Sequence, residues 1–137
     1  MELRVREFFD MAEKISPAAR VLIVDDEALI RWSLNERLSS AGYEVQEAGD
    51  GASALSYFRQ GAPHIDLVVL DLKLPDTDGV DLLKQIKLLS PACRVILMTA
   101  FGTPDKLLEA RDSGAFEVLP KPFNLDKMLQ AVQRALT

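Results

Sequence analysis

The sequence predicts an α/β fold in which a five-stranded parallel sheet carries helices on both faces. Two observations support this prediction. Short apolar runs, such as Leu-Val-Val-Leu at 67–70, alternate five times with longer segments of helical periodicity. The runs are apolar at successive positions, as expected for strands of a parallel sheet that is covered on both sides. At 137 residues, the chain has room for one domain of this kind.

Each strand–helix unit has its own signal in the sequence. The first helix has an apolar stripe through Ile30, Leu34, Leu38 and Ala41, and Gly42 ends it. The fourth helix starts at Pro104, and the last follows the N-cap residue Asn124. The predicted strands are 21–24, 44–48, 67–70, 94–98 and 117–119. The predicted helices are 27–41, 50–60, 80–89, 104–113 and a last one with an apolar face of Leu125, Leu129, Val132 and Leu136.

Residues 1–19 stand outside this alternation, so we divide the chain into an N-terminal extension, 1–19, and a domain, 20–137. Apolar side chains from Val5 to Ile15 fit an amphipathic helix that ends at Ser16-Pro17. We favour a short helix docked on the domain, or a piece of a longer parent chain, over a dimerisation or partner-binding segment.

Composition excludes several classes of function. The 16 Lys and Arg against 21 Asp and Glu give a net charge of −5, which argues against contact with nucleic acid or an anionic membrane. Cys93 and His64 are the only residues of their types, so neither a disulfide framework nor a Cys- or His-rich metal site can form. We expect Cys93 to be a half-buried strand residue. The sequence has no apolar run of membrane-spanning length and no signal peptide at its charged N-terminus. We therefore expect a cytoplasmic protein.

Reactive side chains follow four of the five predicted strands. Asp25 and Asp26 follow the first, Asp71 the third, Thr99 the fourth and Lys121 the fifth. In a parallel sheet these positions meet at one edge. Three carboxylates there repel one another unless a cation joins them, and oxygen ligands with open positions suit Mg²⁺. Together with a hydroxyl and a lysine, this set indicates phosphoryl transfer to a carboxylate.

At these residues the chain resembles the receiver domain of two-component response regulators. The resemblance spans 20–137 and rests on four motifs: Val-Asp-Asp-Glu at 24–27, Leu-Asp-Leu-Lys-Leu-Pro at 70–75 with Asp78-Gly79, Met-Thr-Ala at 98–100, and Leu-Pro-Lys-Pro-Phe at 119–123. It is closest to the receivers of nitrogen-regulation-type activators, which work with the sigma-54 polymerase. Two motifs support this closer resemblance: Arg-Trp-Ser-Leu at 31–34 and Thr-Ala-Phe-Gly-Thr at 99–103. The resemblance implies the flavodoxin-like strand order 2-1-3-4-5.

The resemblance also implies a role for each site residue. Asp71 accepts a phosphoryl group from the phosphohistidine of a sensor histidine kinase. Mg²⁺ is held by Asp25, Asp26, Asp71 and the backbone carbonyl of Lys73. Thr99 and Lys121 contact the phosphoryl oxygens, and the Lys121–Pro122 bond is cis. Such a domain is not an enzyme on other substrates; it catalyses only its own phosphorylation and dephosphorylation, and we expect the latter to be slow because Lys73 and Phe101 flank the acceptor.

One position departs from the family pattern. Val118 stands three residues before the lysine, where the family usually has a Tyr or Phe that swings inward when the threonine engages the phosphoryl group. We expect a phosphorylation-activated switch that changes a dimer or partner contact to control transcription, with the ATPase and DNA-binding domains of such regulators absent from this chain. The alternative is a phosphate-independent interaction module, favoured by Val118 alone. An aspartyl phosphatase is disfavoured because Lys73 stands where its general acid would be.

Overall fold

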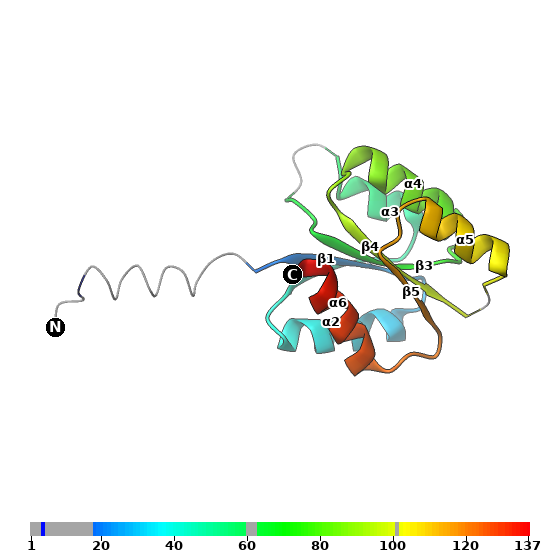
Figure 1. Ribbon diagram of the computed structural model, residues 1–137. Coiled ribbons are helices and arrows are strands. Elements are labelled where there is room, and N and C mark those ends of the chain that lie inside the picture. Colours follow the sequence, from blue (N-terminus) through cyan, green and yellow to red (C-terminus); the bar gives the residue numbers. More distant parts are fainter. Residues whose placement is uncertain (1–3, 5–17, 60–62, 101) are drawn as a thin grey trace.

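The computed structural model describes residues 4, 18–59, 63–100 and 102–137 (Figure 1). The amphipathic segment predicted at 5–15 lies outside these residues. The described part is one parallel sheet in the order β2-β1-β3-β4-β5 between two layers of helices. The predicted fold class and strand order are therefore confirmed.

The five strands lie close to their predicted positions. They are β1 (Arg20–Val24), β2 (Glu44–Ala48), β3 (Leu67–Asp71), β4 (Arg94–Thr99) and β5 (Glu117–Pro120). Two of the strands reach one residue beyond the predicted ends to include Asp71 and Thr99. Both side chains are therefore attached to the rigid rim of the sheet, not to a loop.

Helices cover the two faces unequally. The helices are α2 (Ala28–Ser40), α3 (Gly51–Ser56), α4 (Gly79–Leu89), α5 (Pro104–Asp112) and α6 (Leu125–Leu136). Figure 1 shows α2 and α6 on one side of the sheet and α3, α4 and α5 on the other. Along each central strand, alternate side chains enter opposite layers: Val68 and Leu70 belong to the α3–α5 core, and Leu67 and Val69 to the α2–α6 core. This alternation explains why the strands read as continuous apolar runs.

Three local predictions need correction. Helix α3 ends at Ser56, because the amides of Tyr57 and Phe58 bond three residues back, so the predicted helix to residue 60 is too long. Ala41 is exposed at the C-cap of α2 instead of completing its buried stripe. Cys93, expected to be a half-buried strand residue, is fully buried and precedes β4. Gly42 does end α2, with the positive φ of 98° that favours glycine.

Among the described residues, no helix is both long enough and apolar enough to cross a bilayer.

Candidate functional site

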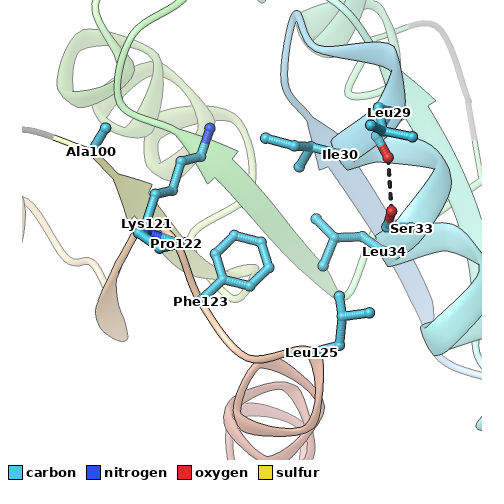
Figure 2. Close-up of a pocket in the computed structure, with 9 residues that line it drawn as sticks. All are labelled: Leu29, Ile30, Ser33, Leu34, Ala100, Lys121, Pro122, Phe123 and Leu125. Atoms are coloured by element: carbon cyan, nitrogen blue, oxygen red, sulfur yellow. Dashed lines mark hydrogen bonds between the residues drawn. The ribbon is translucent and has the colours of Figure 1, made fainter.

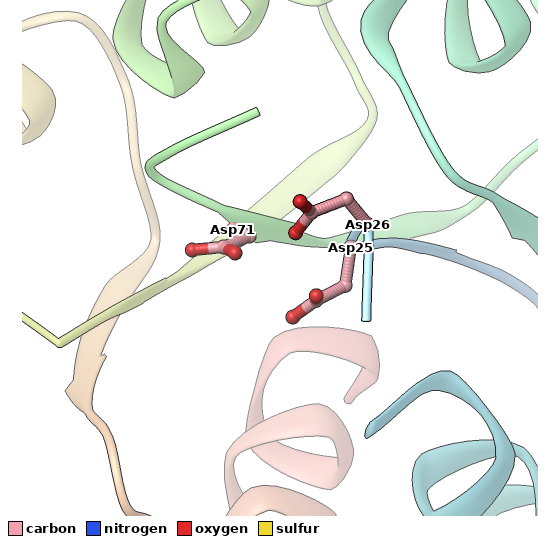
Figure 3. A group of neighbouring side chains, drawn as sticks. All are labelled: Asp25, Asp26 and Asp71. Atoms are coloured by element: carbon pink, nitrogen blue, oxygen red, sulfur yellow. The ribbon is translucent and has the colours of Figure 1, made fainter. Parts of the chain in front are cut away.

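Three aspartates meet at the carboxyl end of the sheet. Strands β1 and β3 are neighbours with Val24 paired to Leu70, so the residues that follow, Asp25 and Asp71, come to the same place on the rim. Asp26 is the next residue of the turn into α2. One carboxylate oxygen from each aspartate lies within 4.8 Å of the others. Figure 3 shows the three side chains next to one another at the end of the strands. The predicted convergence of Asp25, Asp26 and Asp71 is therefore present in the structure.

The three carboxylates differ in their surroundings. Asp25 is fully buried, and its carboxylate accepts hydrogen bonds from the Glu27 amide at 2.8 Å and the Lys121 ammonium at 2.9 Å. Asp71 is also buried and accepts from the same ammonium at 3.1 Å and from the Lys73 amide at 3.3 Å. Asp26 is exposed. The site thus has a buried wall and one carboxylate that faces solvent.

Lys121 reaches the aspartates from the loop between β5 and α6. Its backbone amide donates to the Thr99 carbonyl at 2.7 Å, which ties the start of this loop to β4. The peptide bond to Pro122 is cis, as predicted. One ammonium thus contacts two carboxylates, and Glu27 lies 3.9 Å from it.

Charge in the site is unbalanced toward the negative. Burial raises the pKa of Asp71, and the nearby charge of Asp25 raises it further, while Lys121 offsets only part of the increase. Burial lowers the pKa of Lys121, but the hydrogen bond and charge of Asp25, together with Asp71, outweigh this and raise it overall. Lys121 therefore stays protonated beside three carboxylates. The three carboxylates offer only oxygen ligands, and one of them faces solvent. Such a set of ligands fits a hard divalent cation such as Mg²⁺.

The Thr99 side chain contributes an unpaired hydroxyl. Thr99 is buried at the end of β4, and its Oγ1 has no hydrogen-bond partner among the described residues. It lines a cavity of about 420 Å³ together with Asp26, Asp71, Lys73 and Lys121. A buried hydroxyl without a partner is costly unless a ligand supplies one. The cavity therefore combines a buried carboxylate with two hydrogen-bond donors, an ammonium and a hydroxyl, that suit a phosphoryl group.

A second cavity, of about 660 Å³, opens beside the first and is mainly apolar (Figure 2). Lys121 lines both cavities. The other lining residues come from α2, the end of β4 and the β5–α6 loop: Leu29, Ile30, Ser33, Leu34, Ala100, Pro122, Phe123 and Leu125. The sequence did not reveal this hollow, because Ile30 and Leu34 read simply as core positions of an amphipathic helix.

Val118 lies on the opposite layer, partly buried against the α3–α5 core. It lines a third cavity, of about 480 Å³, with Phe116 and residues of α5. Phe116 is 40% exposed, and its ring lies under the Arg94 guanidinium at 5.9 Å. Phe101, which is expected from the sequence to flank the acceptor, lies outside the described residues.

Two polar contacts around the site were not predicted. The Arg31 guanidinium donates to the backbone carbonyl of Asp25 at 2.6 Å, although the sequence marked Arg31 only as part of a family motif. Asp76 accepts from the first amides of α3, those of Gly51 at 2.8 Å and Ala52 at 3.0 Å. The Arg31 contact spans six residues and the Asp76 contacts span 24 and 25, and residue spacing gave no signal for either.

Comparison with known proteins gives a consistent result. The family model for the response regulator receiver domain matches residues 21–133. Sporulation initiation phosphotransferase F of Bacillus subtilis is 40% identical over 117 residues, which cover 85% of this chain and 93% of that protein. Chemotaxis protein CheY of the same organism is 37% identical, covering 87% of this chain and 98% of CheY.

The transcriptional regulator NtrC of Bradyrhizobium is 42% identical over 88% of this chain, but the match spans only 25% of NtrC. Among solved structures, a receiver domain from Methanospirillum hungatei superposes with a TM-score of 0.83 at 29% identity, covering 87% of this chain and 94% of that chain. A receiver domain from Clostridium thermocellum gives 0.80 at 34%, covering 86% and 94%.

The names of these relatives describe different outputs: a phosphotransferase, a chemotaxis protein and a transcriptional regulator. What they share is the receiver, a phosphorylation-dependent signalling domain that works with a histidine kinase and binds Mg²⁺ at an acidic pocket of this kind. With its fold, its aspartate cluster and these matches, the chain belongs to the receiver domain family of two-component response regulators.

Proposed function

We propose that this chain is a switch in which Asp71 accepts a phosphoryl group from the phosphohistidine of a sensor kinase. The observation that carries the proposal is the Lys121 ammonium, which lies 3.1 Å from Asp71 in a cavity that also holds the unpartnered Thr99 hydroxyl. A carboxylate that served only to stabilise the fold would need neither a cavity beside it nor a free donor facing the same space.

The transfer itself requires little of the protein beyond positioning. A carboxylate oxygen of Asp71 attacks the phosphorus, the P–O bond forms, the P–N bond to the kinase imidazole breaks, and the departing nitrogen takes a proton. Lys121 and Thr99 donate hydrogen bonds to the phosphoryl oxygens as their charge shifts. Lys121 must leave Asp71 in part to do so, and its contact with Asp25 at 2.9 Å keeps it at the site.

In this proposal a Mg²⁺ ion is held by Asp25, Asp26, Asp71 and the backbone carbonyl of Lys73. When bound, the ion would balance the negative charge of three carboxylates and a dianionic phosphoryl group. Asp26 is exposed, so a solvent-facing ligand is available at the rim. Lys121 cannot replace the ion, because one ammonium carries a single charge and already forms ion pairs with Asp25 and Asp71.

The kinase would approach over the apolar cavity of Figure 2. This cavity is placed for that role because Lys121 separates it from the phosphoryl site. Leu29 and Trp32 lie three residues apart on α2 and are 73% and 60% exposed, so they extend the apolar surface outward. We propose that the apolar surface around the kinase's phosphohistidine packs here.

Phosphorylation would then draw Thr99 and the loop after β4 toward the site. We propose that this changes the surface of α5, β5 and α6, where a second copy or another partner binds, and that the output is transcriptional within a longer regulator. The match to NtrC, which this chain spans only in part, supports that output. We expect slow loss of the phosphoryl group, by attack of water on phosphorus with release of inorganic phosphate and recovery of the Asp71 carboxylate.

Incubation with acetyl phosphate followed by intact-mass measurement tests the proposal. We expect one phosphoryl adduct that needs Mg²⁺, disappears with a chelator and is absent in Asp71→Asn. Asp112→Asn, at an exposed position on α5, is the matched control and should keep the adduct. An adduct that persists in Asp71→Asn would refute the assignment of the acceptor.

A second candidate, a phosphate-independent interaction module, is favoured only by Val118, whose side chain is too small for the aromatic switch of the family. In that case we expect neither an adduct from acetyl phosphate or a phosphorylated kinase nor measurable binding of Mg²⁺.

A further inference from the structure

Arg31 holds the turn that presents the first two aspartates. It lies on the first turns of α2, and its Nη1 donates to the backbone carbonyl of Asp25 at 2.6 Å. This carbonyl belongs to the peptide that links Asp25 to Asp26. The plane of that peptide sets the direction in which the Asp26 side chain leaves the backbone. Arg31 therefore contacts neither carboxylate but controls the unit that joins them.

The guanidinium is itself fixed from a third segment. Its Nε donates to Glu47 of β2 at 3.2 Å, and Glu47 accepts from Asn35, one turn further along α2, at 2.7 Å. The Arg31 side chain is 21% exposed, so it is largely shielded from solvent. Asn35, Glu47 and Arg31 thus form a chain of contacts that ends on the Asp25 carbonyl. A planar guanidinium can serve the carboxylate and the carbonyl at once because its donors have a fixed fork geometry.

Among the described residues, the other hydrogen bonds of Asp25 hold its amide and its carboxylate, and the Arg31 contact is the one that holds its carbonyl. The Asp25 amide donates to the Ala48 carbonyl at 3.1 Å, and the Asp25 carboxylate is held by Glu27 and Lys121. Asp25 is fully buried, so without Arg31 its carbonyl would lose its donor in a place from which water is largely excluded. Rotation of the peptide to find another donor would turn the exposed Asp26 carboxylate away from the cluster.

We infer that Arg31 is a positioning residue for divalent-cation binding, acting through the Asp25–Asp26 peptide. The inference rests on the proposed function, which places the cation among Asp25, Asp26 and Asp71. It predicts a change in cation affinity that is opposite in sign to the change expected from electrostatics alone. Removing a positive charge near a cation site should tighten cation binding by Coulomb's law, whereas removing a positioning contact should weaken it.

Titration calorimetry with Mg²⁺ on the full chain tests this inference. We expect Arg31→Met to weaken Mg²⁺ binding by about tenfold or more, in the range seen when residues that support metal ligands are removed. Arg31→Lys keeps the positive charge but lacks the forked N–H donors of a guanidinium. We therefore expect a smaller loss of Mg²⁺ affinity, which cannot be ascribed to charge. Arg37→Met is the matched control, because Arg37 lies on the same helix but pairs with Asp126 of α6 at 2.9 Å. We expect it to leave the affinity within about twofold.

Circular dichroism below the melting temperature shows whether each variant is folded. If Arg31→Met does not fold, the Mg²⁺ affinity of Arg31→Lys tests the inference. Tighter or unchanged Mg²⁺ binding in folded Arg31 variants would overturn the role of Arg31 and leave the proposed function standing. Failure of the unsubstituted chain to bind Mg²⁺ would overturn both.

Discussion

Asp71 is a buried carboxylate whose nearest charged neighbours are two further carboxylates and one ammonium. The pKa of its side chain is raised by burial first and by Asp25 second. A carboxyl group whose pKa is raised on folding favours the folded state only while it is protonated, so its contribution is lost as the pH rises through the folded pKa. At neutral pH, Asp71 therefore opposes folding, as expected of a group placed for chemistry.

We predict that Asp71→Asn raises the melting temperature at pH 7 in a chelator, by roughly 2–5 °C for a domain of this size, because it removes one buried negative charge. The gain should shrink as the pH falls through the raised pKa of Asp71 toward the ordinary aspartate pKa, below which the carboxyl is protonated in both states. Thermal unfolding by circular dichroism at pH 7 and pH 4 measures this. A lower melting temperature for Asp71→Asn at pH 7 would show that the ion pair with Lys121 outweighs the repulsion.

At the scale of elements, the segment between β3 and α4 ties the acceptor to its surroundings. Asp78 caps α4 through the Val80 amide at 2.7 Å and receives the Lys106 ammonium of α5 at 2.8 Å. The Gly79 amide donates to the Leu72 carbonyl at 2.7 Å, which folds the start of α4 back onto the end of β3. The close approach of these two backbone segments depends on the path of the chain, for which the sequence has no pattern.

Gly79 is a glycine because backbone atoms occupy the space beside it. A Cβ there would lie 2.6 Å from the Asp71 carbonyl oxygen and 2.6 Å from the Leu72 Cα. We predict that Gly79→Ala lowers the free energy of unfolding by about 1–3 kcal/mol, as overpacking commonly does, since these atoms cannot move without shifting the acceptor.

Urea denaturation measures this effect. Gly49→Ala is the comparison, because the nearest atom to its Cβ would be Arg31 Nη1 at 3.4 Å, which is an ordinary van der Waals contact. Equal losses for the two variants would contradict the account of Gly79.

At the scale of the whole molecule, the sequence predicts features that follow from burial patterns and motifs. It does not predict features that depend on side-chain packing and on the conformation of individual turns. The meeting of Asp25, Asp71, Thr99 and Lys121 follows from burial patterns and from the rule that parallel strands present their carboxyl ends together, whereas the strand order was implied by the family resemblance. The apolar cavity beside Lys121 depends on packing between distant segments. The early end of α3 and the Arg31 contact with Asp25 are local, but they depend on backbone and side-chain conformations that residue spacing does not reveal. The division at residue 19 and the chemical roles of the site residues stay predictions.

Cys93 reports on the opening of the whole domain. Its side chain is fully buried, and burial raises the pKa of the thiol to about 12. Because the thiolate is the reactive form, we predict that labelling by a disulfide reagent at pH 8 requires unfolding and follows its rate. Above the ordinary thiol pKa, stability should fall as the pH rises toward 12, since only the unfolded state ionises readily.

Stopped-flow labelling in increasing urea measures the opening of the domain, with Asp112→Asn, at an exposed position on α5, as a folded control that keeps Cys93. Rapid labelling in the absence of urea would contradict this picture of a closed core.

The central claim is that the carboxylate of Asp71 is the acceptor, and chemical trapping tests it most directly. After treatment with acetyl phosphate and Mg²⁺, borohydride reduces an aspartyl phosphate to homoserine, and peptide mass spectrometry then locates the changed residue. We predict homoserine at position 71 alone, and none when a chelator replaces Mg²⁺. Homoserine at Asp25 or Asp26, with Asp71 unchanged, would contradict the claim.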